Sequence, residues 1–149
     1  MERKQVKLSN MKKAYITALS TCLILLLSLG TATVSAQQKK GEPWVIPQEY
    51  KVMANPLTAD SVTIKAGKIA YDKKCTLCHG KTGLGDGPRG RMSKTFPGDF
   101  SGEAFQNYTD GEIFYQTKVG RGEMPAFEKR SSDSEIWSMV LYMRTMGGR

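Results

Sequence analysis

The sequence predicts an all-α domain of three to four helices whose long loops enclose one bound group. Two segments, 109–120 and 132–146, combine a helix-capping pair with apolar residues at three- and four-residue spacing. No segment alternates apolar and polar residues over the length of a strand. The connecting segments are long for so small a domain, and long loops in a compact domain usually have a function such as wrapping a ligand.

The first 36 residues have the pattern of an export signal. Five lysines and arginines precede an apolar run at 14–29, and small residues end the segment at Val34-Ser35-Ala36. We therefore expect residues 1–36 to be a signal peptide and the rest to be periplasmic or exported. An uncleaved membrane anchor at 14–29 is the alternative, although a full span takes about 20 predominantly apolar residues.

Removal of this segment changes what the composition indicates. The net charge falls from +8 for the whole chain to +4 for residues 37–149, and Cys22 is lost. The remaining 113 residues suit one domain. No basic stripe with interleaved aromatic residues is present, so we expect no nucleic-acid partner.

The exported part is expected to consist of an N-terminal arm at 37–58 and one domain at 59–149. Three prolines between 43 and 56 argue against a helix in the arm. An extended arm would lay Trp44 and Tyr50 on the surface of the domain. Its role is an open question, and docking to a partner is one hypothesis.

The first helix is expected to start at Asp60 or Ser61, either of which can cap it, and to end near 73–75. Gly67 lies inside this helix, where glycine costs about 1 kcal/mol against alanine. It indicates either close approach by another helix or a tolerated surface glycine. The five glycines of 80–90 predict a tight irregular loop.

Residues 92–105 are expected to form a second loop, with 96–100 packed inward. The next helix should be capped by a box of Thr109 and Glu112 and should stop at Gly120. Its predicted buried stripe is Ile113, Phe114 and Thr117. The last helix has its own box and an expected end at a glycine pair: Ser132 with Glu135, and Gly147-Gly148.

The segment Cys75-Thr76-Leu77-Cys78-His79 has the C-x-x-C-H pattern by which c-type haem is attached. Each thiol can add to one vinyl group of the porphyrin, and His79 would then be the proximal iron ligand. A structural zinc site usually needs about four ligands, and His79 is the only histidine. A thioredoxin-like dithiol would lie in a βαβ pattern, which these flanking residues do not show.

The second axial position of the iron is left to methionine, lysine, water or no ligand. Met124 is best placed, since it lies in a loop before Pro125 and 45 residues after His79. Met92 is the second candidate. Three others are better interpreted as core or tail positions of the last helix: Met139, Met143 and Met146.

Ligation by a thioether would raise the reduction potential and leave no open site on the iron. This favours outer-sphere electron transfer, and we do not expect an enzyme. A ligating histidine usually donates its other N–H to a carbonyl, and Pro88 in the glycine loop offers one.

Over about residues 61–146 the chain resembles the class I monohaem cytochromes c of bacterial periplasms. The motifs that carry the resemblance are Ala66-Gly67-Lys68 with Tyr71, Cys75 to Gly80, Gly85-Asp86-Gly87-Pro88, 110–114, 122–127 and 137–144. The resemblance implies a small cytochrome c fold around one haem c, with the first and last helices crossing near Gly67 and Tyr142. It also implies Met124 as the distal ligand and the Pro88 carbonyl as the partner of His79.

We therefore expect a single-electron carrier, with a respiratory complex, an oxidase or a dehydrogenase as redox partner. Four loop cations could steer an acidic partner towards the haem edge, or could be ordinary solvated charges: Lys81, Arg89, Arg91 and Lys94. One alternative is a haem subunit or tethered module of a larger membrane oxidoreductase. The other is a haem enzyme or gas sensor with an open distal site.

Overall fold

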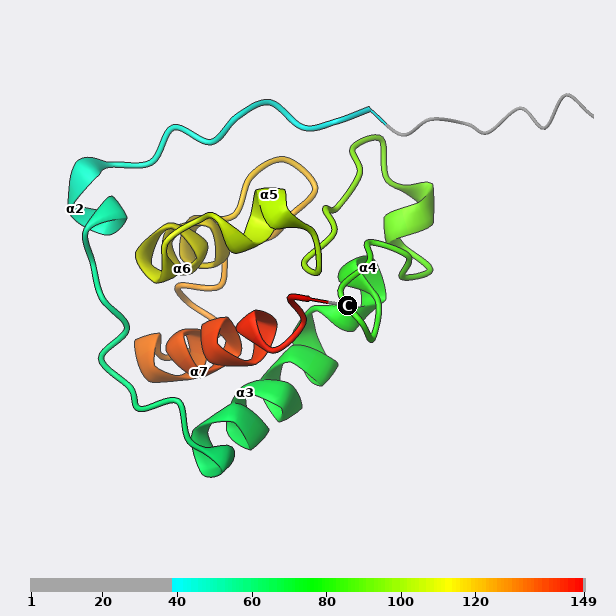
Figure 1. The fold of residues 1–149 in the computed structure, drawn as a ribbon. Coiled ribbons are helices and arrows are strands. Elements are labelled where there is room, and N and C mark those ends of the chain that lie inside the picture. Colours follow the sequence, from blue (N-terminus) through cyan, green and yellow to red (C-terminus); the bar gives the residue numbers. More distant parts are fainter. Residues whose placement is uncertain (1–38, 149) are drawn as a thin grey trace, which may run out of the picture. The chain divides into compact units, whose positions relative to one another are not determined.

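The computed structural model describes residues 39–148, which form an all-α domain (Figure 1). The helices are α2 (Gln48–Lys51), α3 (Ser61–Lys74), α4 (Thr76–His79), the 3-10 helix η1 (Gly90–Met92), α5 (Glu103–Gln106), α6 (Asp110–Val119) and α7 (Asp133–Arg144). Within these residues the only β-type pairings are two isolated bridges, Lys39 with Thr95 and Arg121 with Met124. The expected fold class is confirmed: α3, α6 and α7 form the frame, and the short helices lie in the loops between them.

Two expectations concern residues that the structure does not describe. The predicted signal peptide, 1–36, and the alternative membrane anchor, 14–29, both lie outside 39–148. In the part of the chain that is described, no helix combines the length and the apolar character needed to cross a membrane.

Helix α3 starts where the sequence predicts and packs along α7, beside which it lies in Figure 1. The Asp60 side chain caps it by accepting the N–H of Thr63 at 2.8 Å, which lowers the pKa of this carboxyl. At Gly67 the two helices come so close that a Cβ would overlap the carbonyl oxygen of Ser138. Of the two interpretations of Gly67, close approach by another helix is therefore correct.

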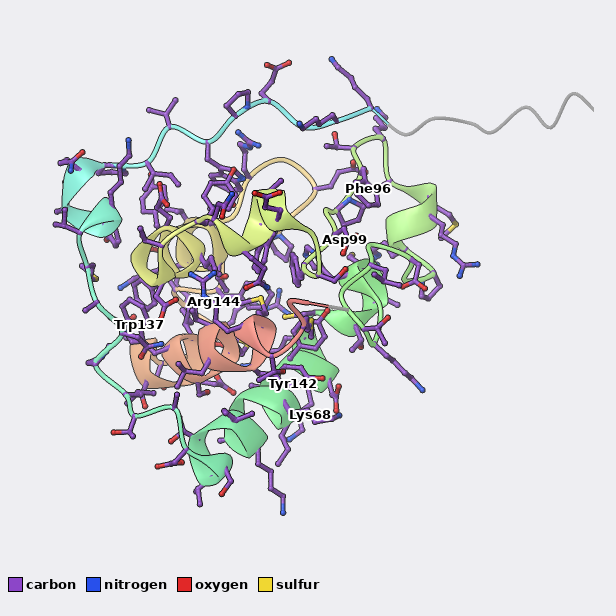
Figure 2. All side chains as sticks on the ribbon, in the orientation of Figure 1. Lys68, Phe96, Asp99, Trp137, Tyr142 and Arg144 are labelled. Atoms are coloured by element: carbon purple, nitrogen blue, oxygen red, sulfur yellow. The ribbon has the colours of Figure 1, made fainter. Side chains whose placement is uncertain are left out.

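The crossing continues towards the C-terminal end of α3. The ring of Tyr142 lies edge-on to that of Tyr71, with 5.3 Å between centroids. Figure 2 shows Tyr142 beside Lys68 of α3, whose Nζ lies 5.8 Å from the centre of its ring. The contact at Tyr142 that the resemblance implies is confirmed.

Helix α6 packs on α7 through aromatic rings. Phe114 and Trp137 stack with 4.0 Å between centroids and 13° between planes. Both halves of the capping box of Thr109 and Glu112 form, and α6 ends before Gly120, as predicted. The predicted stripe is buried, and so are the three methionines assigned to the core: Ile113, Phe114, Thr117, Met139, Met143 and Met146.

The start of α7 differs in one detail from the predicted capping box. Ser132 accepts the N–H of Glu135, but the Glu135 carboxylate binds Lys74 Nζ at 2.7 Å instead of returning to the cap. This hydrogen bond lowers the pKa of Glu135. Because Lys74 is the last residue of α3, the ion pair ties the end of α3 to the start of α7.

The end of α7 also differs from the prediction. The regular helix stops at Arg144, and Thr145 is the cap, so the glycine pair at 147–148 lies beyond it. Arg144 binds Asp110 at 2.7 Å and also donates to the carbonyls of Gln106 and Tyr108. Figure 2 shows its side chain between α6 and α7. These bonds hold the chain before α6 against the last turn of α7.

The arm is not fully extended, and the prediction of no helix there is wrong. Helix α2 starts directly after Pro47, which is its N-cap with φ −59° and ψ 146°. The ring of Tyr50 lies 4.7 Å from that of Tyr115 on α6. Ile46 is buried. Figure 1 shows the arm in cyan, passing along α6 before it turns at α2 towards α3.

The predicted loop at 92–105 contains the first part of α5, which spans Glu103–Gln106. Its expected inward packing is correct for Phe100, which is buried, and wrong for Phe96, which remains 37% exposed. A four-residue helix is too short to show a period in the sequence, which is why α2, α4 and α5 were missed.

One buried hydrogen bond connects α3 to the turn that follows α4. Tyr71 is fully buried, and its hydroxyl donates to the carbonyl oxygen of Gly80 at 2.8 Å. Burial raises the pKa of this phenol, so it remains a donor at all physiological pH values. The end of the C-x-x-C-H segment is thereby held to the helical frame.

Replacing Gly67 with alanine should destabilise the protein by about 1–3 kcal/mol, because the new methyl group would force α3 away from α7. Helix propensity alone predicts the opposite, a gain of about 1 kcal/mol. Denaturant unfolding of the haem-attached protein measures the difference. An exposed position on the same helix serves as control, since Lys65→Ala should change stability little. A stabilised Gly67→Ala protein would contradict the close crossing.

Replacing Tyr71 with phenylalanine should cost about 1–2 kcal/mol of unfolding free energy, because the buried carbonyl of Gly80 loses its donor. Tyr142→Phe is the matched control. Its ring contacts that of Tyr71, but its hydroxyl makes no hydrogen bond within residues 39–148. Equal stability of the two variants would show that the Tyr71 hydroxyl contributes nothing.

Candidate haem-binding site

The C-x-x-C-H residues lie where α3 ends and α4 begins. The N–H of Cys75 donates to the Tyr71 carbonyl at 2.8 Å and so closes α3. The N–H groups of Cys78 and His79 donate to the Cys75 carbonyl at 3.1 and 2.9 Å. This single turn places both thiols and the imidazole close together, and both thiols are half-buried and outside any disulfide.

Burial raises the pKa of the Cys75 thiol to about 12. Reactive dithiols of the thioredoxin kind depend on a lowered thiol pKa, which makes the attacking sulfur a thiolate. The environment of Cys75 therefore does not suit a dithiol oxidoreductase.

The His79 ring is desolvated, and this lowers its pKa to about 4. The imidazole is therefore neutral at pH 7, which is the form that binds a metal. It stacks on Phe100 with 4.5 Å between centroids. Its Nδ1 is buried and has no hydrogen-bond partner among the described residues, so the bond to Pro88 is not formed here. A buried, unpaired ring nitrogen is rare, so Nδ1 still lacks the hydrogen-bond partner that a ligating histidine usually has.

The glycine loop wraps closely around the backbone of α4. A Cβ at Gly87 would lie 2.5 Å from the carbonyl oxygens of Thr76 and Leu77, and one at Gly90 would overlap that of Cys78. The N–H of Arg89 donates to the Leu77 carbonyl at 2.9 Å. The loop therefore places Pro88 next to the C-x-x-C-H turn, and Gly87 and Gly90 are needed because the two backbones are in contact.

Met124 lies in a separate loop, at the end of a tight turn. Arg121 and Met124 exchange two backbone hydrogen bonds of 2.9 and 3.0 Å, and Gly122 supplies the positive φ of 60° that such a turn needs. The Met124 side chain is half-buried. Met92, the second candidate, is 80% exposed. The structure thus separates the two candidates by burial.

The Met124 turn is connected to the segment after η1. The Glu123 carboxylate accepts the N–H groups of Lys94 and Thr95 at 2.9 and 3.3 Å. Two side chains that precede Met124 in this turn, Arg121 and Glu123, were not predicted from the sequence. No local pattern could have indicated them, because their partners lie 28 to 79 residues away.

The four loop cations that could steer a partner are all exposed: Lys81, Arg89, Arg91 and Lys94. Exposed apolar side chains occur on the same segment, between α4 and the loop after η1: Leu77, Leu84, Met92 and Phe96. Asp86 is the only acidic residue from 77 to 96, so this segment carries a net positive charge.

Comparison with known proteins identifies the family. Residues 62–143 match the family described as cytochrome C oxidase, cbb3-type, subunit III. The chain is 31% identical over 101 residues to the cbb3-type cytochrome c oxidase subunit CcoP of Azospirillum brasilense, covering 67% of this chain and 34% of that subunit. It is 26% identical over 133 residues to cytochrome c6 of Thermosynechococcus vestitus, covering 89% of this chain and 91% of that protein.

A solved structure is also similar. It is a chain of the reducing HAO-like protein complex of Kuenenia stuttgartiensis, with a TM-score of 0.56 and 30% identity, covering 73% of this chain and 52% of that chain. The present chain thus spans about a third of the length of the oxidase subunits it matches and about half that of the solved chain.

The family match covers more than half of the chain and includes the complete C-x-x-C-H segment. The half-buried thiols and the neutral, unpaired His79 fit the covalently attached haem c that such proteins carry. The chain therefore belongs to the cytochrome c family described as cytochrome C oxidase, cbb3-type, subunit III, and its cofactor is a covalently bound haem c.

Proposed function

We propose that this protein is a single-electron carrier in which Cys75 and Cys78 hold the haem and His79 and Met124 are its axial ligands. The observation that carries the proposal is the position of Met124, half-buried in a turn that other segments hold in place. The other methionines lack this combination. Met139, Met143 and Met146 are buried in the core, Met92 is 80% exposed, and Met53, on the arm, is 37% exposed.

The bound haem supplies a one-electron couple, and the chain sets the conditions under which it works. His79 stays neutral because its ring is buried, and Phe100 packs against its face. The thioether of Met124 would be the second protein ligand of the iron and would favour its reduced state. With both positions filled, no site is left for substrate, and the proposal is therefore a carrier without catalytic activity.

We also propose that the carbonyl of Pro88 accepts a hydrogen bond from His79 Nδ1 when the haem is attached. The support is that Nδ1 is buried and unpaired, and that the glycine loop holds Pro88 next to α4. A hydrogen bond at this nitrogen would orient the ring and increase its basicity as a ligand.

A second candidate function is a haem module of a larger oxidoreductase, working in the periplasm. Two relatives favour it, because their names place them in the cbb3-type oxidase and in the HAO-like complex. Pull-down from solubilised membranes with the exported protein, with and without residues 37–56, separates the two functions. Capture of an oxidoreductase that requires these residues would support the module, and a protein recovered free of any complex would support the carrier.

Replacement of Met124 by alanine should abolish the weak long-wavelength absorption band of methionine-ligated ferric haem. The same variant should bind carbon monoxide when reduced, because the distal position becomes free. Met92→Ala is the matched control and should keep the band, since that side chain is 80% exposed. A band that survives in Met124→Ala would exclude this ligand. Carbon monoxide binding by the unmodified reduced protein at neutral pH would favour the enzyme or gas sensor.

If the loop cations steer an acidic redox partner, the rate of electron transfer to an anionic metal complex should fall as ionic strength rises. Charge reversal by Arg89→Glu and Arg91→Glu together should lower this rate several-fold at low salt. Lys129→Glu, on the loop before α7, is the control. It changes the net charge by as much as either single arginine replacement, and it should lower the electron-transfer rate less. A rate that does not depend on salt would show that these cations are ordinary solvated charges.

A further inference from the structure

The turn that carries Met124 is bound by the N-terminal arm through one side chain. The Arg121 guanidinium donates to the carbonyl oxygens of Pro43 and Glu42 at 3.0 and 2.7 Å. The same guanidinium lies over the ring of Trp44, 4.2 Å from its centre. Three consecutive arm residues therefore hold one arginine, which itself forms the backbone pair with Met124.

The other side of the turn is held by a third segment, which also binds the arm. Glu123 accepts the N–H groups of Lys94 and Thr95. The N–H of the next residue, Phe96, donates to the carbonyl of Lys39 at 3.1 Å. Figure 2 shows Phe96 close to the start of the arm. Residues 39–44, 94–96 and 121–124 thus meet in what we call the three-segment junction.

The base and the tip of the methionine loop are held by different parts of the domain. At the base, the N–H groups of Phe127 and Glu128 donate to the Lys118 carbonyl of α6 at 3.0 and 3.1 Å. At the tip, a Cβ on Gly122 would have no atom within 4 Å. Two side chains on either side of this open tip hold the turn. Arg121 binds the arm, and Glu123 binds residues 94–95.

We propose that Arg121 is a positioning residue, and that the arm, by binding it, keeps Met124 in place on the iron. This inference rests on the proposed ligation by Met124. Release of an axial thioether requires the loop that carries it to open locally, and the free energy of that opening includes every contact that must break. The hydrogen bonds and the ring contact of Arg121 break in such an opening, whereas the bonds at the base of the loop need not.

The test uses the haem-attached protein and its Arg121→Gln and Trp44→Ala variants. Imidazole serves as a competing ligand for the ferric iron, because its apparent affinity increases as the Met124 loop opens more easily. Loss of the two hydrogen bonds and the ring contact should increase this affinity roughly tenfold in Arg121→Gln. Arg121→Lys keeps the charge but loses the guanidinium that donates to two carbonyls at once. It should therefore increase imidazole affinity by less than Arg121→Gln does.

Arg130→Gln is the matched control, because that arginine also lies over an aromatic ring, Phe127 at 5.4 Å, but does not touch the arm. It should leave imidazole affinity unchanged. The double variant Trp44→Ala/Arg121→Gln should resemble Arg121→Gln, since both changes remove the same contact. Unchanged imidazole affinity in Arg121→Gln, with Met124 established as ligand, would overturn the proposal.

Hydrogen exchange of the Met124 amide gives a readout that does not depend on the ligand. This N–H donates to Arg121 within the turn, and its protection should fall in Arg121→Gln while that of amides in α7 stays constant. Loss of protection confined to the turn shows that the arm holds it, even if the Met124→Ala spectrum excludes ligation. Protection equal to that of the unmodified protein would show that the arm does not hold the turn.

Discussion

The close crossing of α3 and α7 is the contact on which the rest of the structure depends. Gly67 lets the two backbones meet, and the rings of Tyr71 and Tyr142 then pack together a turn further along. This fixes the C-terminal end of α3, from which Cys75 and α4 follow directly. The Tyr71 hydroxyl and the Lys74–Glu135 pair reinforce the same end of the helix. The C-x-x-C-H turn is therefore an extension of the α3–α7 helix pair.

The two sides of the proposed iron site are supported in different ways. On the His79 side, α4 is enclosed by the glycine loop, whose backbone touches it so closely that side chains are excluded. On the Met124 side, the turn has open space at its tip and is held by two charged side chains bound to distant segments. The first kind of support is steric and local. The second is polar and long-range, and we expect substitutions there to loosen the turn without unfolding the domain.

The relatives contain this domain in different settings. One cytochrome c6 aligns over nearly its whole length, whereas the oxidase subunits are about three times as long as the matched part. The family match begins at residue 62, after the arm, whereas the alignment with this cytochrome c6 covers 89% of the chain. In this chain it packs on α6 and reaches the Met124 turn, and it thereby contributes to the domain itself.

The sequence by itself determined the C-x-x-C-H motif, the frame of three long helices with their N-caps, and the core role of three methionines. These follow from local spacing, because a capping pair, a helical period or a C-x-x-C-H segment lies within a few residues.

Only the tertiary structure decided the reason for Gly67, the pairing of Glu135 with Lys74 instead of its cap, and the course of the arm. It also showed that Arg121 and Glu123 secure the Met124 turn. Those outcomes depend on groups dozens of residues apart, which no local pattern brings together.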